Sequence, residues 1–156
     1  MGIIAPKEIS TGSKVLLILF AISLFPILIV WVLLYLLWGG ILCVAAWLTW
    51  RKRQVLFVYS DSSIWKGYIE KEIIPYIEDK AILLNWSERK SWKASLAVSA
   101  FRYFGGHRNF NPMGIIFRPF HPVKTYRFFQ AFKKFKHGNP GEVEEVKNKL
   151  FENLGI

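Results

Sequence analysis

The sequence predicts an α/β protein whose N-terminal part lies in a membrane. The chain runs from Val15 to Trp50 without one Asp, Glu, Lys, Arg or His, whereas a bilayer span needs only about 20 apolar residues. Residues 54–156 then alternate between short β-rich runs and stretches with apolar residues at helical spacing, which is typical of a small α/β domain. We expect a short tail at 1–14, a transmembrane helix or helical hairpin at 15–50, and a cytoplasmic α/β domain at 54–156.

The composition narrows the class of protein. Of the 156 residues, 53% are hydrophobic, above the roughly 45–50% that is typical of soluble domains, so disorder is excluded as the main state. A single cysteine excludes a disulfide framework, a cysteine-rich zinc site and a CxxC redox pair. The formal net charge of +10 favours a negatively charged partner, such as anionic lipid or nucleic acid.

Two arrangements of the apolar run are open. One straight helix over 15–50 would be about 54 Å long, against a hydrocarbon core of about 30 Å, so a hairpin of two short spans fits the bilayer better. Trp47 and Trp50 would then form one interfacial belt, and the aromatic residues near the middle of the run would reach the opposite interface: Trp31, Tyr35 and Trp38. Against the hairpin, no polar turn separates the halves, which leaves a single kinked helix as the alternative.

The basic residues after the run predict its orientation. Arg51, Lys52 and Arg53 follow Trp50 directly, and positive residues close to a span stay on the cytoplasmic side. We therefore expect the C-terminal domain to face the cytoplasm. Cys43 lies within the run, where a packing role is expected.

The second part of the chain predicts seven elements. Strands are expected where β-branched and aromatic residues form short runs, and helices where apolar residues recur every three or four positions. Polar residues before the first helix are expected to cap it. The order is β-α-β-α-β-β-α, with strands at 55–59, 81–86, 113–117 and 125–132, and helices at 64–78, 91–104 and 142–154.

This order resembles the thioredoxin and glutaredoxin-like fold. The resemblance rests on the strand at 55–59, on Asn111-Pro112 leading into the third strand, and on the glycine turn at Gly138 before the last helix. It implies that Pro112 is a cis proline. The redox motif of that family would fall on residues 60–65, which contain no cysteine, so the resemblance implies a redox-inactive relative. An unrelated small α/β sandwich is the alternative.

Polar residues at the strand ends predict a binding pocket. Ligands of parallel α/β sheets gather at the carboxyl ends of the strands, and a helix N-terminus there would offer N–H groups to an anion. We expect a pocket for a phosphate, nucleotide or peptide, although local caps and turns explain the same residue types. The candidates are Ser60, Asp61, Ser62, Ser63, Asn85, Trp86, Asn111 and Pro112.

A basic stretch predicts a surface that faces lipid. Residues 102–141 contain eight Lys and Arg and no Asp or Glu, with aromatic residues between them. Beside a membrane anchor, such charges are attracted to an anionic leaflet; a plain solvated surface is the alternative, and a nucleic-acid site is less favoured. The candidates are Arg51, Lys52, Arg53, Arg118, Lys124, Arg127, Lys133, Lys134 and Lys136.

Catalytic patterns are sparse. His107, His121 and His137 lack the spacing of a zinc site, so neither a metal nor a cofactor is expected. The favoured interpretation is a non-catalytic, membrane-anchored scaffold or binding module with an unidentified protein partner. The alternative is a membrane-bound enzyme acting on an anionic, phosphate-bearing substrate through Asp61, Asn85 and Arg or His residues of the 102–127 region. Self-association through small residues of the apolar run is also expected to be feasible: Gly39, Gly40, Ala45 and Ala46.

Overall fold

The computed structural model describes residues 11–106 and 111–156. The chain divides into two compact units, of which the first ends at Trp38 and the second runs from Gly39 to Ile156. Each unit is described by itself. The protein is α/β, with a long apolar helix at the N-terminus and a small mixed sheet.

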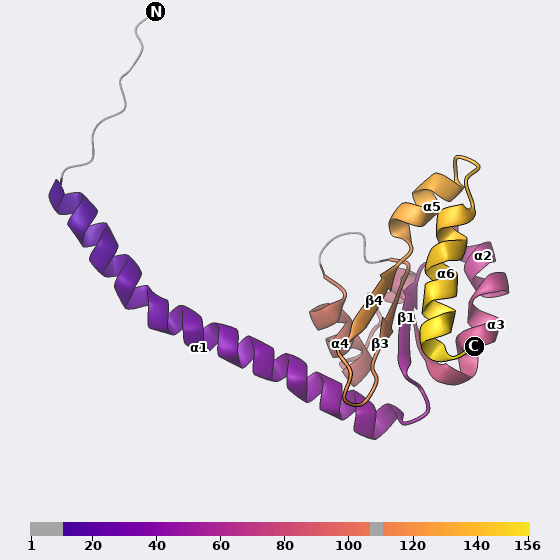
Figure 1. Cartoon of the computed structure of the whole chain (residues 1–156), viewed down its shortest axis with the longest axis horizontal. Helices are drawn as coiled ribbons and strands as arrows, with labels where there is room; N and C mark the ends of the chain where they lie inside the picture. The colour runs from indigo at the N-terminus through magenta and orange to yellow at the C-terminus, as the bar shows by residue number, and fades with distance from the viewer. Residues whose placement is uncertain (1–10, 107–110) are drawn as a thin grey trace, which may run out of the picture. The chain divides into compact units, whose positions relative to one another are not determined.

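The apolar run forms one helix, α1 (Thr11–Trp50), of 40 residues (Figure 1). The expected hairpin is therefore wrong. Pro26 lies inside α1, and neither it nor the Gly39-Gly40 pair ends the helix, because no polar turn residues lie between the two halves. The helix is long and apolar enough to cross a membrane. In the first unit its large apolar side chains are exposed.

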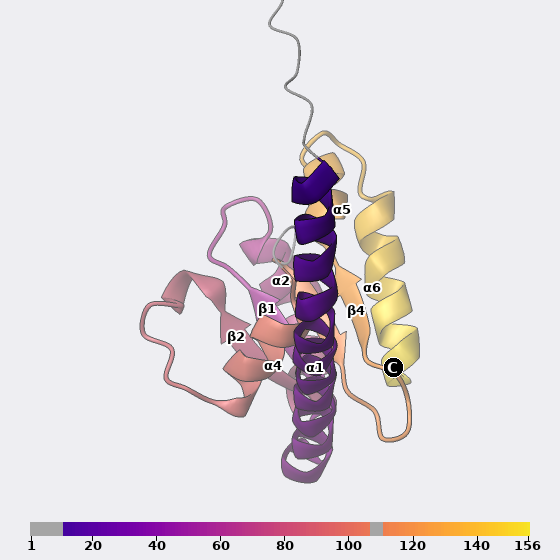
Figure 2. The same ribbon diagram turned by 90° about the vertical axis from the view of Figure 1, so that its left-hand side faces the viewer.

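The second unit contains a four-stranded sheet in the order β2-β1-β3-β4. The strands are β1 (Val55–Tyr59), β2 (Ala81–Asn85), β3 (Met113–Ile116) and β4 (Lys124–Arg127). The pair β1–β2 is parallel, as predicted, whereas β1–β3 and β3–β4 are antiparallel. Figure 2 shows β2, β1 and β4 in this order across the sheet. We call the end where β1 and β2 finish and β3 begins the site end.

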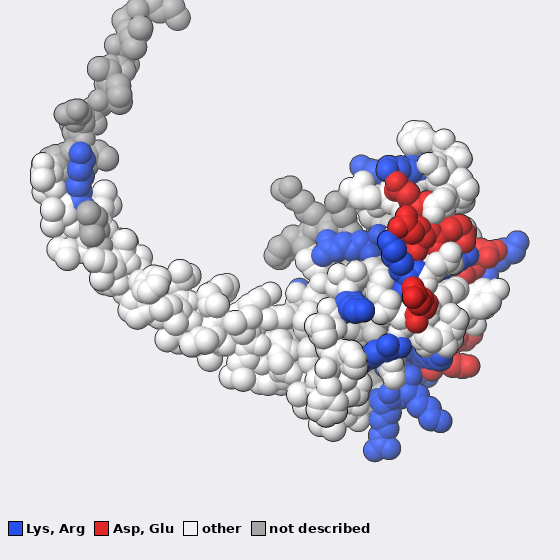
Figure 3. Space-filling view, in the orientation of Figure 1, with Lys and Arg blue, Asp and Glu red and all other residues white. Residues whose placement is uncertain are grey.

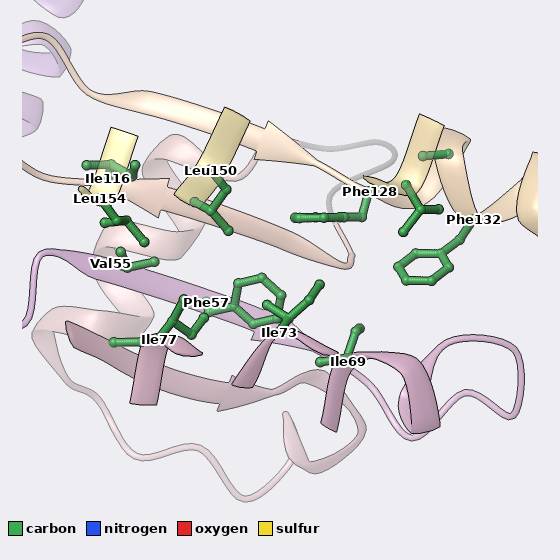
Figure 4. Packing of buried hydrophobic residues seen from close by; sticks show 13 residues of the cluster. Val55, Phe57, Ile69, Ile73, Ile77, Ile116, Phe128, Phe132, Leu150 and Leu154 are labelled. Atoms are coloured by element: carbon green, nitrogen blue, oxygen red, sulfur yellow. The ribbon is translucent and has the colours of Figure 1, made fainter. Parts of the chain in front are cut away.

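Successive residues of a strand point to opposite faces of the sheet. Both faces of this sheet carry buried apolar residues, and helices cover both. Val55 and Phe57 face one side, where α2 (Lys66–Glu72), α3 (Ile74–Ile77) and α6 (Gly141–Leu154) pack (Figures 1 and 4). Burial of these large apolar side chains stabilises the layer.

The opposite face is covered by α4 (Leu96–Phe104) and by the last part of α1, which we call the domain end of α1 (Gly39–Trp50). Ala46 packs there with Leu56 and Val58 of β1. Gly39 and Ala46 are buried, so two of the four small residues expected to permit self-association lie against the domain.

Two elements differ in kind from the prediction, and the helix expected at 91–104 begins later, at Leu96. The helix expected at 64–78 is divided into α2 and α3, because Pro75, which lies at the start of α3, has no N–H for a helical hydrogen bond. The strand expected at 125–132 ends at Arg127 and is followed by a helix, α5 (Phe129–Phe135). Phe128 and Phe132 are both buried, and their spacing of four residues would place them on one face of a strand as well as of a helix.

Candidate functional site

The structure brings Asp61 and Asn85 together at the site end. Asp61 follows the end of β1, and Asn85 is the last residue of the parallel strand β2. The Asn85 side-chain amide donates a hydrogen bond of 3.0 Å to the Asp61 carboxylate. Ser87 accepts a further bond of 3.0 Å from the Asp61 backbone N–H. Asn85 Oδ1 accepts from the Ser87 N–H at 3.0 Å and so caps a short 3₁₀ helix, Trp86–Glu88. These bonds join the ends of the two strands.

The charge of Asp61 is compensated locally. Lys66 Nζ lies 2.8 Å from its carboxylate, and this ammonium, followed by the Asn85 amide, lowers the pKa of Asp61. The carboxylate is exposed to solvent. An exposed, ionised and already paired carboxylate holds the strand ends together and is a poor proton donor or acceptor for catalysis.

The serines before α2 do not cap it, contrary to the prediction. The helix begins at Lys66, and no side chain makes a capping hydrogen bond. Ser60 is buried and accepts a bond of 3.2 Å from the Trp65 indole N–H, while Ser62 Oγ accepts one of 3.3 Å from the Ile64 N–H. Ser63 is exposed in the turn. The serines therefore shape a turn at 62–65 and present no helix N-terminus to a ligand.

Asn111 and Pro112 reach the same end of the sheet, because β3 runs antiparallel to β1 and Met113 pairs with Val58. The peptide bond between them is cis. The Pro112 carbonyl accepts a hydrogen bond of 2.9 Å from the Phe128 N–H, just before α5. Trp86 instead packs with Trp92 and Phe101 under α4. It therefore belongs to the core of the α4 face.

A groove that the sequence analysis missed lies beside these residues. We call it the α5 groove; it has a volume of about 450 Å³ and lies between the turn at 62–65 and α5. The Trp65 ring centroid lies 6.2 Å from that of Phe129 and 5.9 Å from that of Phe132. Its lining consists of Ile64, Trp65, Phe129, Phe132, Lys133, Lys136 and His137.

The signal for the groove was present in the sequence. Phe129, Phe132, Lys133 and Lys136 are spaced i, i+3, i+4 and i+7, which places them on one helical face. The expectation of a strand over 125–132 concealed this spacing, since a strand would separate them.

The predicted basic residues lie at two ends of the sheet. Arg118 and Lys124 flank the turn between β3 and β4, and Ile116 pairs with both Val55 and Lys124, so they lie at the end opposite the site end. The residues Arg51, Lys52 and Arg53, which lead into β1, lie there too. By contrast, Arg127 pairs with Met113 at the site end, and α5 follows it with Lys133, Lys134 and Lys136.

Several of these basic side chains already have protein partners. Lys134 forms an ion pair with Glu142, Lys124 donates a bond of 2.8 Å to Asn153, and Arg127 donates one of 3.1 Å to the Gly105 carbonyl. Figure 3 shows basic and acidic side chains side by side on the second unit. The expected single basic face is therefore divided into separate groups.

Among the described histidines, His137 lines the α5 groove, whereas His121 does not lie at the site end. His121 lies in the β3–β4 connection, at the opposite end of the sheet, with Nδ1 2.9 Å from the Pro119 carbonyl. His107 and Arg108 lie outside the described residues. Within residues 11–106 and 111–156, no three metal-binding side chains form a group that could hold an ion.

Comparisons with protein-family models, with curated proteins and with solved structures found no match to this chain.

Proposed function

We propose that the chain is a membrane-anchored, non-catalytic binding module whose recognition site is the site end of the sheet. The observation that carries the proposal is the uncovered apolar surface of α1 up to Trp38. Leu16, Phe20 and Ile27 have 70%, 61% and 64% of their surface exposed. A continuous apolar surface of this size is unfavourable in water, and lipid is the solvent that it fits.

The free part of α1 has the length and flanks of a single span. From Thr11 to Trp38 it is about 42 Å long at 1.5 Å per residue, enough for a tilted helix in a core of about 30 Å. Lys14 stands at one end, and Trp31, Tyr35 and Trp38 stand near the other, which suits an interfacial aromatic belt. Trp50 instead packs edge-on against Phe117, with ring centroids 5.2 Å apart.

The orientation follows from charge. Arg51, Lys52 and Arg53 lie within about 15–20 residues of Trp38, the range over which positive residues keep a flank on the cytoplasmic side. We therefore place the α/β domain in the cytoplasm.

A thioredoxin-like, redox-inactive domain is part of the proposal. The succession of four strands with intervening helices and the final helix α6 supports this part of the proposal. The turn at 62–65 contains no cysteine, and the thiolate is the nucleophile of redox chemistry. We therefore assign the site end a role in binding. Asp61 holds the strand ends in place there through its contacts with Lys66 and Asn85.

Cysteine labelling tests the anchor and its orientation. In a Cys43→Ala background, Lys14→Cys and Asn148→Cys each carry one thiol. The first lies at the N-terminal end of the span and the second on the exposed surface of α6. A membrane-impermeant maleimide should label the Lys14→Cys variant in intact cells and the Asn148→Cys variant only after the cells are opened. Cys43→Ala alone is the unlabelled control. Labelling of both positions from the same side, or recovery of the chain without membranes, would refute the proposal.

A further inference from the structure

We infer that the α5 groove binds the phosphate-bearing headgroup of an anionic phospholipid. This inference rests on the proposed function, because the anchor supplies the lipid. The groove has the size of a small-ligand site: about 450 Å³, within the roughly 300–1,000 Å³ of such sites.

The floor of the groove is aromatic and held in place. Phe132 is fully buried and lies between Trp65 and Tyr68, with ring centroids 5.9 Å and 5.5 Å away. Trp65 is held by its hydrogen bond to Ser60, and Phe128, next to Phe129, is held by its bond to the Pro112 carbonyl. A rigid apolar floor suits the glycerol and upper acyl carbons of a lipid.

The rim of the groove carries positive charge without local compensation. Lys133, Lys136 and His137 line it, and no Asp or Glu does. In the part of the chain that the structure describes, these three side chains form no ion pair, whereas neighbouring Lys134 is paired with Glu142 and Lys66 with Asp61. Lys133 Nζ lies 5.3 Å above the Phe129 ring. The groove therefore favours an anion over a neutral ligand.

The combination of floor and rim selects an anionic amphiphile. Free phosphate would satisfy the lysines and leave Trp65 and Phe129 exposed to water. A phospholipid headgroup places its phosphate at the rim and its glycerol over the rings. An acidic peptide shares this chemistry, but the anchor of the proposed function favours the lipid, because it keeps the domain at a membrane.

The groove lies at the end of the sheet where the chain enters the second unit. Gly39 packs against Tyr103 in the last turn of α4. Two residues later, the Gly105 carbonyl accepts a hydrogen bond from Arg127, which ends β4 immediately before Phe128 and α5. Gly39, the first residue of the second unit, therefore lies toward the site end of the sheet.

The test is a titration of the full chain in uncharged detergent with short-chain dihexanoyl phosphatidylglycerol, followed by calorimetry. The double variant Lys133→Gln/Lys136→Gln should bind about 25-fold more weakly, at about fivefold per lysine. The matched control, Lys124→Gln/Lys134→Gln, removes the same charge outside the groove lining and should bind within about twofold of the wild type. Near-ultraviolet circular dichroism checks that both variants are folded.

Two further arms identify the ligand. Phe129→Ala should weaken phosphatidylglycerol binding but leave the weaker binding of inorganic phosphate unchanged. An equal loss in both double variants, phosphate binding as tight as lipid binding, or displacement of the lipid by a short Glu- and Phe-containing peptide would each overturn the inference. The cysteine labelling is independent of the titration. A correctly inserted chain that does not bind phosphatidylglycerol refutes only this inference. A chain that fails to insert refutes the proposed function.

Discussion

Gly39 of α1 lies against the ring of Tyr103 in α4: a Cβ built on Gly39 would stand 2.6 Å from Tyr103 Cε1. The neighbouring Gly40 meets no atom within 4 Å. The contact marks the point where α1 becomes part of the core of the α/β domain.

This difference predicts opposite outcomes for two adjacent substitutions. Gly39→Leu should destabilise the domain by about 1–3 kcal/mol, because Tyr103 must move out of its packed position. Gly40→Leu should be neutral or slightly stabilising, since leucine favours the helix over glycine. Thermal unfolding in detergent, followed by near-ultraviolet circular dichroism, measures both. Equal stabilities would show that the domain end of α1 does not pack as described.

A second pair of glycines tests the packing of α6 on the sheet. A Cβ on Gly114 of β3 would lie 3.2 Å from Leu150 Cδ1 and 3.5 Å from Phe57 Cδ2, and both of these side chains are fully buried. Gly114→Ala should therefore cost about 1–3 kcal/mol. Gly67→Ala in α2, where nothing lies within 4 Å, should stabilise the helix by up to about 1 kcal/mol. Chemical denaturation compares them, and a stabilising Gly114→Ala would contradict the close approach of Leu150.

Tyr68 predicts a loss of stability at alkaline pH. Its hydroxyl donates to the Glu144 carboxylate, and burial, followed by that hydrogen bond, raises the pKa of Tyr68 to about 12. Since the folded-state pKa is above the unfolded value of about 10, the contribution is complete below about pH 10 and is lost as the pH rises through about 12. Tyr68→Phe should lack this loss and be about 1 kcal/mol less stable at neutral pH. Tyrosinate absorbance measures the pKa of Tyr68, and unfolding curves at several pH values measure the stability. Ionisation of Tyr68 near pH 10 would be inconsistent with its hydrogen bond to Glu144.

The ion pair between Asp61 and Lys66 predicts a small loss of folding stability at acid pH. Lys66 lowers its pKa, so its contribution is present above the unfolded value of about 3.9 and disappears as the pH falls through the lower folded value. The wild type should be more stable than Asp61→Asn at pH 7, and the gap should close in acid. Asp79→Asn is the matched control, because Asp79 has no ion pair among the described residues. A gap that persists in acid would assign Asp61 a role other than the ion pair with Lys66.

Much of the sheet could be predicted because its strands are short runs of β-branched and aromatic residues. Val55–Tyr59 and Ala81–Asn85 flank a helical segment, which favours a parallel crossover, and the pairing of Asp61 with Asn85 follows from it. The final helix was evident from apolar residues at helical spacing over 142–154.

The missed features have physical causes. Phe128, Phe129 and Phe132 have high β-propensity, and Phe128 and Phe132 would share one face of a strand as they do of a helix. A short apolar run of this kind does not distinguish the two elements, and the structure forms a helix there. Because α5 was not predicted, the α5 groove beside it was not predicted either. The boundary at Gly39 could not be predicted because lipid and a protein core accept the same apolar side chains.

The α/β domain needs the buried domain end of α1 to complete its fold. Leu42 is buried and Ala46 packs against β1, so a protease that cuts at Arg51-Lys52-Arg53 would leave the released fragment with an exposed hydrophobic face. Cleavage before Gly39 would instead free a fragment that keeps its whole core. The exposed part of α1 therefore cannot be exchanged for another helix at the basic residues: any graft must carry over the twelve residues that follow Trp38.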